Sequence, residues 1–279
     1  MMILEGKTLK NKILKELKEE INRLEIKPTL VVIQVGNDSA SNIYVSQKEK
    51  MSNKIGINFI HKKLEGTITE KELIDIIEKY NKDNNVDGIL VQMPLPKHID
   101  ENNIQNAINY QKDVDGLTDI NAGRLIHNKD SLIACTSLGI IELLKYYNID
   151  IKSKNVVIVG RSNLVSKPLY SLFLNNDATV TICHSKTSNL EKFTKEADIL
   201  VVATGKKHLI TKNMVKEGST IIDVGINRIN DDIYGDADFD NIKSIANITP
   251  VPGGVGQMTV AMLGKNVLKA YYLRKGQKY

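Results

Sequence analysis

The stretch Lys154-Asn-Val-Val-Ile-Val-Gly160-Arg161-Ser162-Asn163-Leu-Val-Ser166-Lys-Pro168 reads as a strand, a tight turn and the start of a helix. A turn of this kind places main-chain N–H groups and a helix N-terminus where they can bind phosphate. The usual dinucleotide fingerprint Gly-x-Gly-x-x-Gly is absent, because residues 162 and 166 are both serine. The turn alone is therefore a weak indication of a nucleotide site, and the rest of the chain has to support it.

Strand-like and helix-like segments alternate on both sides of this turn. Strands are expected at Thr29–Val35, Ile57–Leu64, Gly88–Met93, Asn155–Val159, Thr179–His184, Ile199–Ala203 and Thr220–Val224. Helices are expected at Thr8–Leu24, Ile43–Lys54, Thr69–Lys82, Glu101–Asn109, Thr136–Tyr147 and Met258–Leu273, and from about Pro168. Strands separated by helices predict an α/β fold with parallel sheets and crossover connections.

Local signals mark the ends of two of these helices. Asp38 is placed to cap the helix that carries Ile43–Lys54, and Gly56 is placed to end it. Thr69 and Glu72 have the spacing of a capping box, which predicts that a helix begins there.

Length and residue usage exclude several kinds of protein. A chain of 279 residues is long enough for one large or two medium domains. Cys135 and Cys183 have no paired or metal-type spacing, which fits a reducing compartment, and the five histidines are scattered, so no metal site is predicted. Apolar runs are too short to span a membrane and the N-terminus has no signal-peptide pattern, so we expect a cytoplasmic protein without a membrane partner.

The charge pattern argues against a nucleic-acid partner. The net charge is +5, but the lysines mostly alternate with glutamates, as on solvated helix faces. Aromatic residues make up 5% of the chain and tryptophan is absent, so a stacking platform for single strands is poorly supported. A polyanionic small ligand is the kind of partner that remains.

The end of the strand at Thr179–His184 favours NADP over NAD. An NAD enzyme usually places an acid there, which holds the ribose hydroxyls. This chain has Cys183-His184-Ser185-Lys186 instead, with no carboxylate to repel a phosphate. Together with Arg161, this pattern favours NADP; the alternative is that Arg161 and Lys186 are solvated surface charges.

A second unusual stretch is Asn247-Ile-Thr-Pro250-Val-Pro252-Gly253-Gly254-Val-Gly256-Gln-Met-Thr259. Its prolines fix the backbone, and the three glycines at 253, 254 and 256 leave bare main chain and make positive φ accessible. Such a segment allows a ligand to lie flat against the main chain. An ordinary turn is the less specific interpretation.

These two stretches and three others resemble the methylenetetrahydrofolate dehydrogenase/cyclohydrolase family. The other three are Ala40–Ile57, Val91–Pro96 and Lys112–Gly116, and all five segments occur in the family's order. The chain departs from the usual family pattern where Ser137, Ser166 and Gln257 replace proline, glycine and proline. Ser166 adds bulk where a helix and a strand are expected to pack closely.

The resemblance implies a bifunctional enzyme of one-carbon metabolism and purine biosynthesis. It would oxidise 5,10-methylenetetrahydrofolate with NADP and hydrolyse the methenyl product to 10-formyltetrahydrofolate. The implied fold has two three-layer α/β domains, residues 1–120 with about 262–279 and residues 121–261. The second is a Rossmann-type NADP-binding domain, the C-terminal helix returns to the first, and the implied assembly is a homodimer.

The same resemblance implies the site residues. The catalytic residues are Lys48, Tyr44, Gln92 and Asp115. The substrate-binding residues are Tyr44, Lys48, Val91, Gln92, Asp115, Pro252, Gly253 and Gly254. The cofactor-binding residues are Gly160, Arg161, Ser162, Ser185 and Ile226. For the carboxylate that pairs with the pterin, Asp113 is an alternative to Asp115.

The implied residues suit the implied chemistry. Tyr44 and Lys48 lie four residues apart and hence on one helix face, although an unremarkable surface pair has the same spacing. A lysine serves both steps if burial or neighbouring charge depresses its pKa. A monofunctional dehydrogenase and a non-catalytic folate- or nucleotide-binding regulator remain alternatives. A general NADP oxidoreductase would explain residues 154–227 but not Tyr44 and Lys48.

Overall fold

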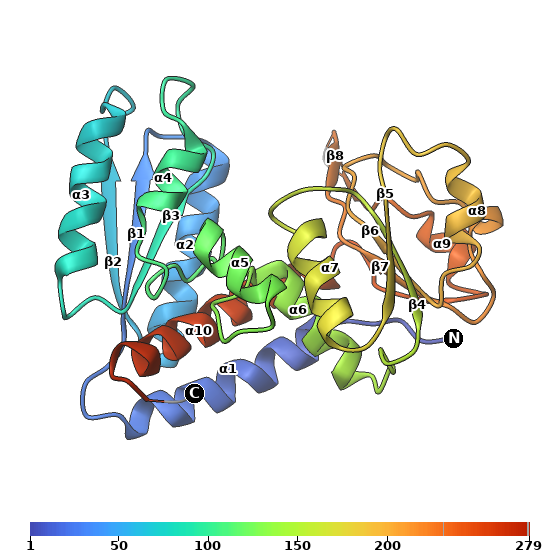
Figure 1. The fold of residues 1–279 in the computed structure, drawn as a ribbon, viewed down its shortest axis with the longest axis horizontal. Helices are drawn as coiled ribbons and strands as arrows, with labels where there is room; N and C mark the ends of the chain where they lie inside the picture. The colour runs from blue at the N-terminus through green and yellow to red at the C-terminus, as the bar shows by residue number, and fades with distance from the viewer. Residues whose placement is uncertain (231, 278) are drawn as a thin grey trace. The chain divides into compact units, whose positions relative to one another are not determined.

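The protein has a mixed α/β fold with two parallel sheets, and the computed structural model describes residues 1–230, 232–277 and 279 (Figure 1). The chain divides into two compact units. The three-stranded unit consists of Lys12–Cys135 and Val260–Tyr279, and the five-stranded unit of Met1–Asn11 and Thr136–Thr259. The α/β class is confirmed, and Val260–Tyr279, which include most of the C-terminal helix, share a unit with Lys12–Cys135, as expected. The predicted domain ranges, 1–120 with about 262–279 and 121–261, stay a prediction.

The three-stranded unit contains a parallel sheet in the order β2-β1-β3. Its strands are β1 (Thr29–Val35), β2 (Asn58–Leu64) and β3 (Gly88–Gln92). Its helices are α2 (Ser39–Ile55), α3 (Glu70–Lys82), α4 (Glu101–Ala107) and α5 (Asp119–Ile126). Every residue of the central strand β1 is buried, which is typical of a strand covered on both faces.

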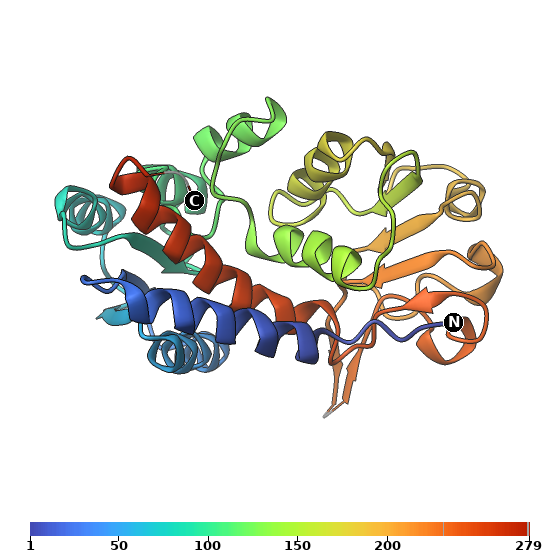
Figure 2. The same cartoon turned by 90° about the horizontal axis from the view of Figure 1, so that it is seen from below.

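Alternate residues of the strands form the core beneath α3 and α4. Val31, Ile33 and Ile89 point to the same face of the sheet, because successive side chains of a strand alternate. Leu73 of α3 and Ile104 of α4 pack against them. Helix α2 lies on the opposite face (Figures 1 and 2), so this sheet is the middle of three layers.

The five-stranded unit contains a parallel sheet in the order β10-β7-β6-β4-β5. Its strands are β4 (Asn155–Val159), β5 (Thr179–Cys183), β6 (Ile199–Val202), β7 (Thr220–Asp223) and β10 (Asn247–Ile248). Strand β5 extends the sheet on one side of β4, and β6 extends it on the other. In a doubly wound sheet, ligands bind at the carboxyl ends of the strands where the order reverses. The position for a ligand is therefore the end of β4 and β6.

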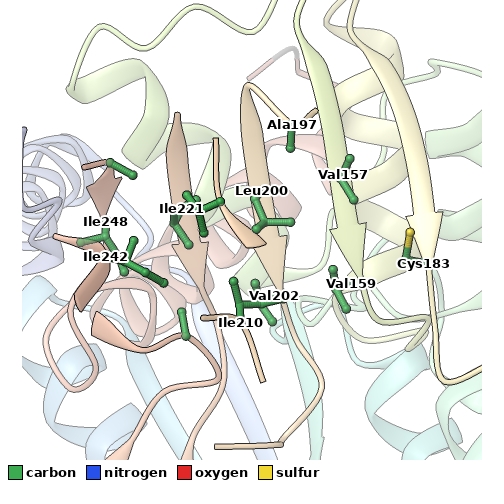
Figure 3. Packing of buried hydrophobic residues seen from close by; sticks show 13 residues of the cluster. Val157, Val159, Cys183, Ala197, Leu200, Val202, Ile210, Ile221, Ile242 and Ile248 are labelled. Atoms are coloured by element: carbon green, nitrogen blue, oxygen red, sulfur yellow. The ribbon is translucent and has the colours of Figure 1, made fainter. Parts of the chain in front are cut away.

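The core of this unit is formed by aliphatic side chains from neighbouring strands. Val157, Leu200 and Ile221 of β4, β6 and β7 are at most 1% exposed, and Figure 3 shows them side by side. The remaining elements of the unit are short. They are α6 (Cys135–Tyr146), α7 (Ser166–Asn175), α8 (Leu190–Thr194), the 3-10 helix η1 (Lys212–Met214), α9 (Phe239–Ile242) and the hairpin of β8 (Asn227–Ile229) and β9 (Asp232–Tyr234). The first residue of α6, Cys135, is counted with the three-stranded unit.

The predicted helix ends agree with the structure where the signal is local. Asp38 caps α2 by accepting from the N–H of Ser41 at 2.8 Å, and Gly56 ends the helix with φ +88°. Thr69 and Glu72 form the predicted capping box of α3. Helix α7 begins at Ser166, two residues before the predicted position. None of the helices in the described ranges is both long and apolar enough to cross a membrane.

Two long helices contribute residues to both units. They are α1 (Gly6–Arg23) and α10 (Val255–Arg274). Within the three-stranded unit, Arg274 ends α10 and its Nη2 lies 2.7 Å from Oδ1 of Asp87. The other carboxylate oxygen of Asp87 accepts from the N–H of Thr29 at 2.8 Å. Because Asp87 is 2% exposed, this ion pair fixes the end of α10 to the sheet.

We expect Arg274→Met to destabilise the three-stranded unit. The variant keeps an apolar stem but leaves the buried Asp87 carboxylate without its cation, and breaking a buried pair in this way costs about 3–5 kcal/mol. The measurement is the midpoint of urea unfolding. Lys15→Met is the control, because the Lys15–Glu19 pair is 3.9 Å long with side chains 79% and 58% exposed. Such a pair contributes about 0–1 kcal/mol, so equal midpoints for the two variants would contradict the prediction.

Candidate active site

Lys48 on α2 and Gln92 at the end of β3 are in direct contact. The ammonium nitrogen Nζ of Lys48 donates to Oε1 of Gln92 at 2.5 Å. Gln92 is buried, and its Nε2 donates to the carbonyl of Met93 at 2.7 Å. Because the amide nitrogen is used by that carbonyl, the amide oxygen is left to hold the lysine. The glutamine therefore fixes where the amine lies.

The surroundings of Lys48 change its acidity. Burial lowers the pKa of Lys48 below the ordinary lysine value, while Asp115 and Cys135 oppose this shift. Burial has this effect because it penalises the charged ammonium and not the neutral amine. The neutral amine is therefore reached at a lower pH than in an exposed lysine, which suits a group that both takes and gives protons.

Two carboxylates in the segment after α4, Asp113 and Asp115, have different surroundings. Asp113 is fully buried, and four donors surround it. They are the N–H groups of Gly116 and Thr118 and the side-chain amides of Gln105 and Asn121. Asp115 is only partly buried; burial raises the pKa of its carboxyl, and Lys48 opposes that shift. Asp115 is thus the carboxylate that remains available for a substrate.

Tyr44 and Val91, the other two residues predicted for this unit, differ in the solvent exposure of their side chains. Tyr44 lies one turn before Lys48 on α2 and is 46% exposed, so its ring is free to contact a ligand. The side chain of Val91 belongs to the core beneath α3 and α4, so only its main chain is left for a substrate. A contact of either residue with a substrate stays a prediction.

Pro252, Gly253 and Gly254 belong to the five-stranded unit. Gly253 has φ +117°, a conformation that side chains disfavour, which agrees with the prediction from the sequence. Its carbonyl accepts from the N–H of Gly6 at 2.9 Å, and the N–H of Gly254 donates to the carbonyl of Pro250 at 2.8 Å. The segment is thus held by its own turn and by the first residues of the chain. Its role in substrate binding stays a prediction.

A pocket of about 350 Å³ lies at the carboxyl ends of β4, β5 and β6. It is lined by Val159, Gly160, Arg161, His184, Ser185, Thr187, Leu190, Ala203, Thr204, Lys206 and Leu209. These residues include two cations and no acid, so the pocket suits an anionic ligand. The position agrees with the reversal of strand order, and it fits a nucleotide.

The turn after β4 packs closely against the segment after β6 and the start of α7. Gly160 has φ +139°, and a Cβ at this position would lie 2.5 Å from the carbonyl oxygen of Ala203 and 2.8 Å from Oγ of Ser166. Only glycine fits here. The hydroxyl of Ser162 accepts from the N–H groups of Val165 and Ser166, so Ser162 shapes the first turn of α7.

The pocket contains some of the residues that the sequence implied for the cofactor. Of the residues expected to bind the cofactor, Gly160, Arg161 and Ser185 line it, whereas Ser162 and Ile226 are not among its lining residues. Their contact with a cofactor stays a prediction. Ile226 is 55% exposed in the turn between β7 and β8. Thr204 and Lys206 were missed. The rule that places ligands at strand ends would have found them if it had been applied to the strand predicted at Ile199–Ala203.

Two family models together match most of the chain. The tetrahydrofolate dehydrogenase/cyclohydrolase catalytic domain matches residues 4–115, and the NAD(P)-binding domain of the same family matches residues 134–275. The chain belongs to the tetrahydrofolate dehydrogenase/cyclohydrolase family.

Relatives in this family are similar over nearly their whole length. The bifunctional protein FolD of Campylobacter hominis is 50% identical over 275 residues, which cover 97% of each chain. The crystal structure of the bifunctional enzyme FolD from Campylobacter jejuni is 44% identical with a TM-score of 0.96 and 99% coverage of both chains. A Trypanosoma brucei FolD complexed with NADP cofactor and inhibitor is 33% identical with a TM-score of 0.93, covering 100% of this chain and 99% of that one.

The departures from the family pattern are accommodated inside the five-stranded unit. The hydroxyl of Ser137 donates to the carbonyl of Val165 at 3.0 Å. The side chain of Gln257 accepts from Nζ of Lys10 at 2.9 Å. Ser166 is completely buried, and its Oγ has no hydrogen-bond partner. The added bulk of Ser166 is therefore tolerated, but its hydroxyl is buried without compensation.

We expect Ser166→Ala to stabilise this family member. The variant removes an unpaired buried hydroxyl, whose desolvation costs about 1–3 kcal/mol. A gain of about 1 kcal/mol corresponds to a rise in Tm of roughly 2–4 °C for a unit of this size. Thermal unfolding followed by calorimetry measures the change. Ser171→Ala on the same helix is the control, because the Ser171 hydroxyl is bonded to the carbonyl of Lys167; a lower Tm for Ser166→Ala than for that control would refute the prediction.

Proposed function

We propose that this enzyme oxidises 5,10-methylenetetrahydrofolate with NADP and hydrolyses the resulting 5,10-methenyltetrahydrofolate to 10-formyltetrahydrofolate. The observation that carries this proposal is the contact of Lys48 with Gln92, in a chain that also has the nucleotide pocket. The first step needs the nucleotide, and the second needs proton transfer. The two activities together belong to one-carbon metabolism and supply purine biosynthesis.

NADP, when bound, accepts the hydride that leaves the one-carbon unit. Gly160 would let the phosphates approach the main chain, and Ser162 shapes the helix start behind them. Arg161 and Ser185 line the pocket where no acid is present, and they would hold the 2′-phosphate. Exposed Ile226 would offer an apolar contact to the cofactor.

Lys48 is the group that moves protons in the hydrolysis. Water must lose a proton as it attacks the methenyl carbon, and the nitrogen released on ring opening must gain one. A lysine whose pKa is lowered by burial serves both transfers in turn. Gln92 holds the amine through its side-chain oxygen, so the proton is transferred at a fixed position.

The remaining residues would position the folate. The partly buried Asp115 would accept hydrogen bonds from the amino-pyrimidine edge of the pterin, because Asp113 is already occupied by four donors. Tyr44 would pack on the ring system from its exposed position on α2. The main chain of Val91 and the segment Pro252–Gly254 would complete the contacts.

An assay of the purified protein with methylenetetrahydrofolate and either NADP or NAD tests the whole proposal. Reduced nucleotide and methenyl absorbance are followed separately. A bifunctional enzyme forms reduced nucleotide, while the methenyl absorbance rises only transiently. Accumulation of the methenyl compound would identify a monofunctional dehydrogenase, and no turnover at all would identify a binding protein.

We expect Lys48→Met to lose at least about 10²-fold in cyclohydrolase rate, the lower end of what an acid–base group contributes. The dehydrogenase rate falls less, because hydride transfer depends more on positioning than on a proton. Hydrolysis of added methenyltetrahydrofolate measures the first rate and NADPH formation the second. Lys50→Met is the control, because Lys50 is exposed on the same helix. Unchanged hydrolysis in a folded Lys48→Met protein would remove the lysine from the mechanism.

The wild-type enzyme should prefer NADP to NAD, and Arg161→Ala should remove most of that preference. Loss of a hydrogen bond to a charged phosphate costs about 1.5–3 kcal/mol, or roughly ten- to a hundredfold in affinity. The ratio of kcat/KM for the two cofactors measures the change. Lys152→Ala serves as the control, since that side chain is 79% exposed and pairs with Asp177. An Arg161→Ala enzyme with the wild-type ratio would contradict this assignment.

We also propose that the enzyme is a cytoplasmic homodimer. This proposal is supported by the resemblance to the family. Light scattering across a range of protein concentrations tests the dimer, and cell fractionation tests the location.

A further inference from the structure

A buried carboxylate stands behind the nucleotide pocket without lining it. Asp236 follows β9 and is 0% exposed. Its Oδ2 accepts from the N–H and the hydroxyl of Thr204, at 2.6 and 2.9 Å, and from the N–H of Gly205 at 3.0 Å. Its Oδ1 accepts from the N–H of Lys206 at 2.9 Å and from the side-chain amide of Asn227 at 2.9 Å. Five donors thus converge on one side chain.

Four of these donors belong to residues 204–206, the loop that leaves β6. Thr204 and Lys206 line the pocket, and Ala203 before them does as well. The N–H of Ala203 donates to the carbonyl of Val159 at 2.9 Å, and the Ala203 carbonyl lies against Gly160. The path of this loop therefore sets both the position of Lys206 and the wall that faces the turn after β4.

A second buried carboxylate holds Asp236 itself in place. Asp223, the last residue of β7, accepts from the N–H of Asp236 at 2.9 Å and from the N–H of Ala237 at 2.8 Å. It also accepts from the N–H of Gly225 at 3.0 Å. A Cβ at Gly225 would overlap Asp236, so glycine is required where the two segments meet. The position of the Asp236 carboxylate is thus fixed by the sheet.

We propose that Asp236 is a positioning residue for the cofactor: it holds the loop of residues 204–206 in the shape that binds NADP. This inference rests on the proposed NADP site. The carboxylate replaces water as the partner of three consecutive main-chain N–H groups, so the loop has its bound shape before the nucleotide arrives. A loop ordered in advance binds more tightly, because binding no longer has to order it.

The test is the variant Asp236→Asn, in which size is kept and one acceptor oxygen becomes a donor. In either orientation the new NH2 group faces at least two of the five donors. We expect the Kd for NADP, measured by calorimetry with the full-length protein and no folate, to rise about tenfold or more. Hydrolysis of added methenyltetrahydrofolate needs no nucleotide and is expected to stay within about threefold of wild type, which separates a local effect from general damage.

Asp198→Asn is the matched control. Asp198 lies at the opposite, amino end of β6, where it accepts from the N–H of Asn155 at 2.9 Å and from Nζ of Lys216 at 2.6 Å. This variant also loses carboxylate hydrogen bonds in the same sheet, but it should bind NADP as wild type does. Equal losses of affinity in Asp198→Asn and Asp236→Asn would overturn the proposal, since they would show that destabilisation alone weakens binding. A folded Asp236→Asn with the wild-type Kd would overturn it as well.

A pair of milder variants decides the case if Asp236→Asn does not fold. Thr204→Val removes the hydroxyl that donates to Asp236 and keeps the shape, whereas Thr204→Ser keeps the hydroxyl. The proposal expects weaker NADP binding in the valine variant than in the serine variant, and the reverse order would overturn it. If the wild-type protein fails to bind NADP at all, the proposed function fails first and this inference fails with it.

Discussion

A loop that leaves the carboxyl end of a buried parallel strand carries N–H groups that need partners away from water. In the five-stranded unit a buried carboxylate meets this need for the loop after β6, and in the three-stranded unit another does the same for the loop between α4 and α5. Asp113 accepts from the N–H groups of Gly116 and Thr118, which follow Asp115 in the chain. Asp236 accepts from the three N–H groups of residues 204–206. The segments that carry the site residues are therefore fixed by charge-assisted hydrogen bonds.

Asp113 and Asp115 lie two residues apart but differ in their hydrogen-bond partners. Asp113 is fully buried and already accepts from four donors of its own unit. Asp115 contributes charge close to Lys48, where it opposes the effect of burial. The acidity of the lysine is thus set by two opposing influences, desolvation and a negative neighbour. Gln92 holds the amine of Lys48 in place through a hydrogen bond and carries no charge of its own.

The sequence predicted those features whose causes are local. The cap of α2 at Asp38 and the capping box of α3 need only residues within three positions, so pattern alone identified them. The fully buried run of β1 was equally clear. Helix α5 was not predicted, although its cap is also local: the hydroxyl of Thr118 accepts from the N–H of Asn121, three residues on. The four hydrogen bonds to Asp113, which distinguish it from Asp115, were not predictable from spacing. The hydrogen bond between Asp236 and Thr204 joins residues 32 positions apart, and no rule of sequence spacing predicts it.

The ion pair between Arg274 and Asp87 has a consequence for the order in which the protein is made. The two residues lie 187 positions apart, so Asp87 leaves the ribosome long before its partner exists. The five-stranded unit has a similar dependence within itself: Ile3, near the start of the chain, pairs with Ile248 of β10, which is synthesised late. Although segments generally fold as they emerge, neither unit can close until nearly all of the chain has been synthesised. A ribosome that stops early therefore releases two incomplete units rather than one finished half.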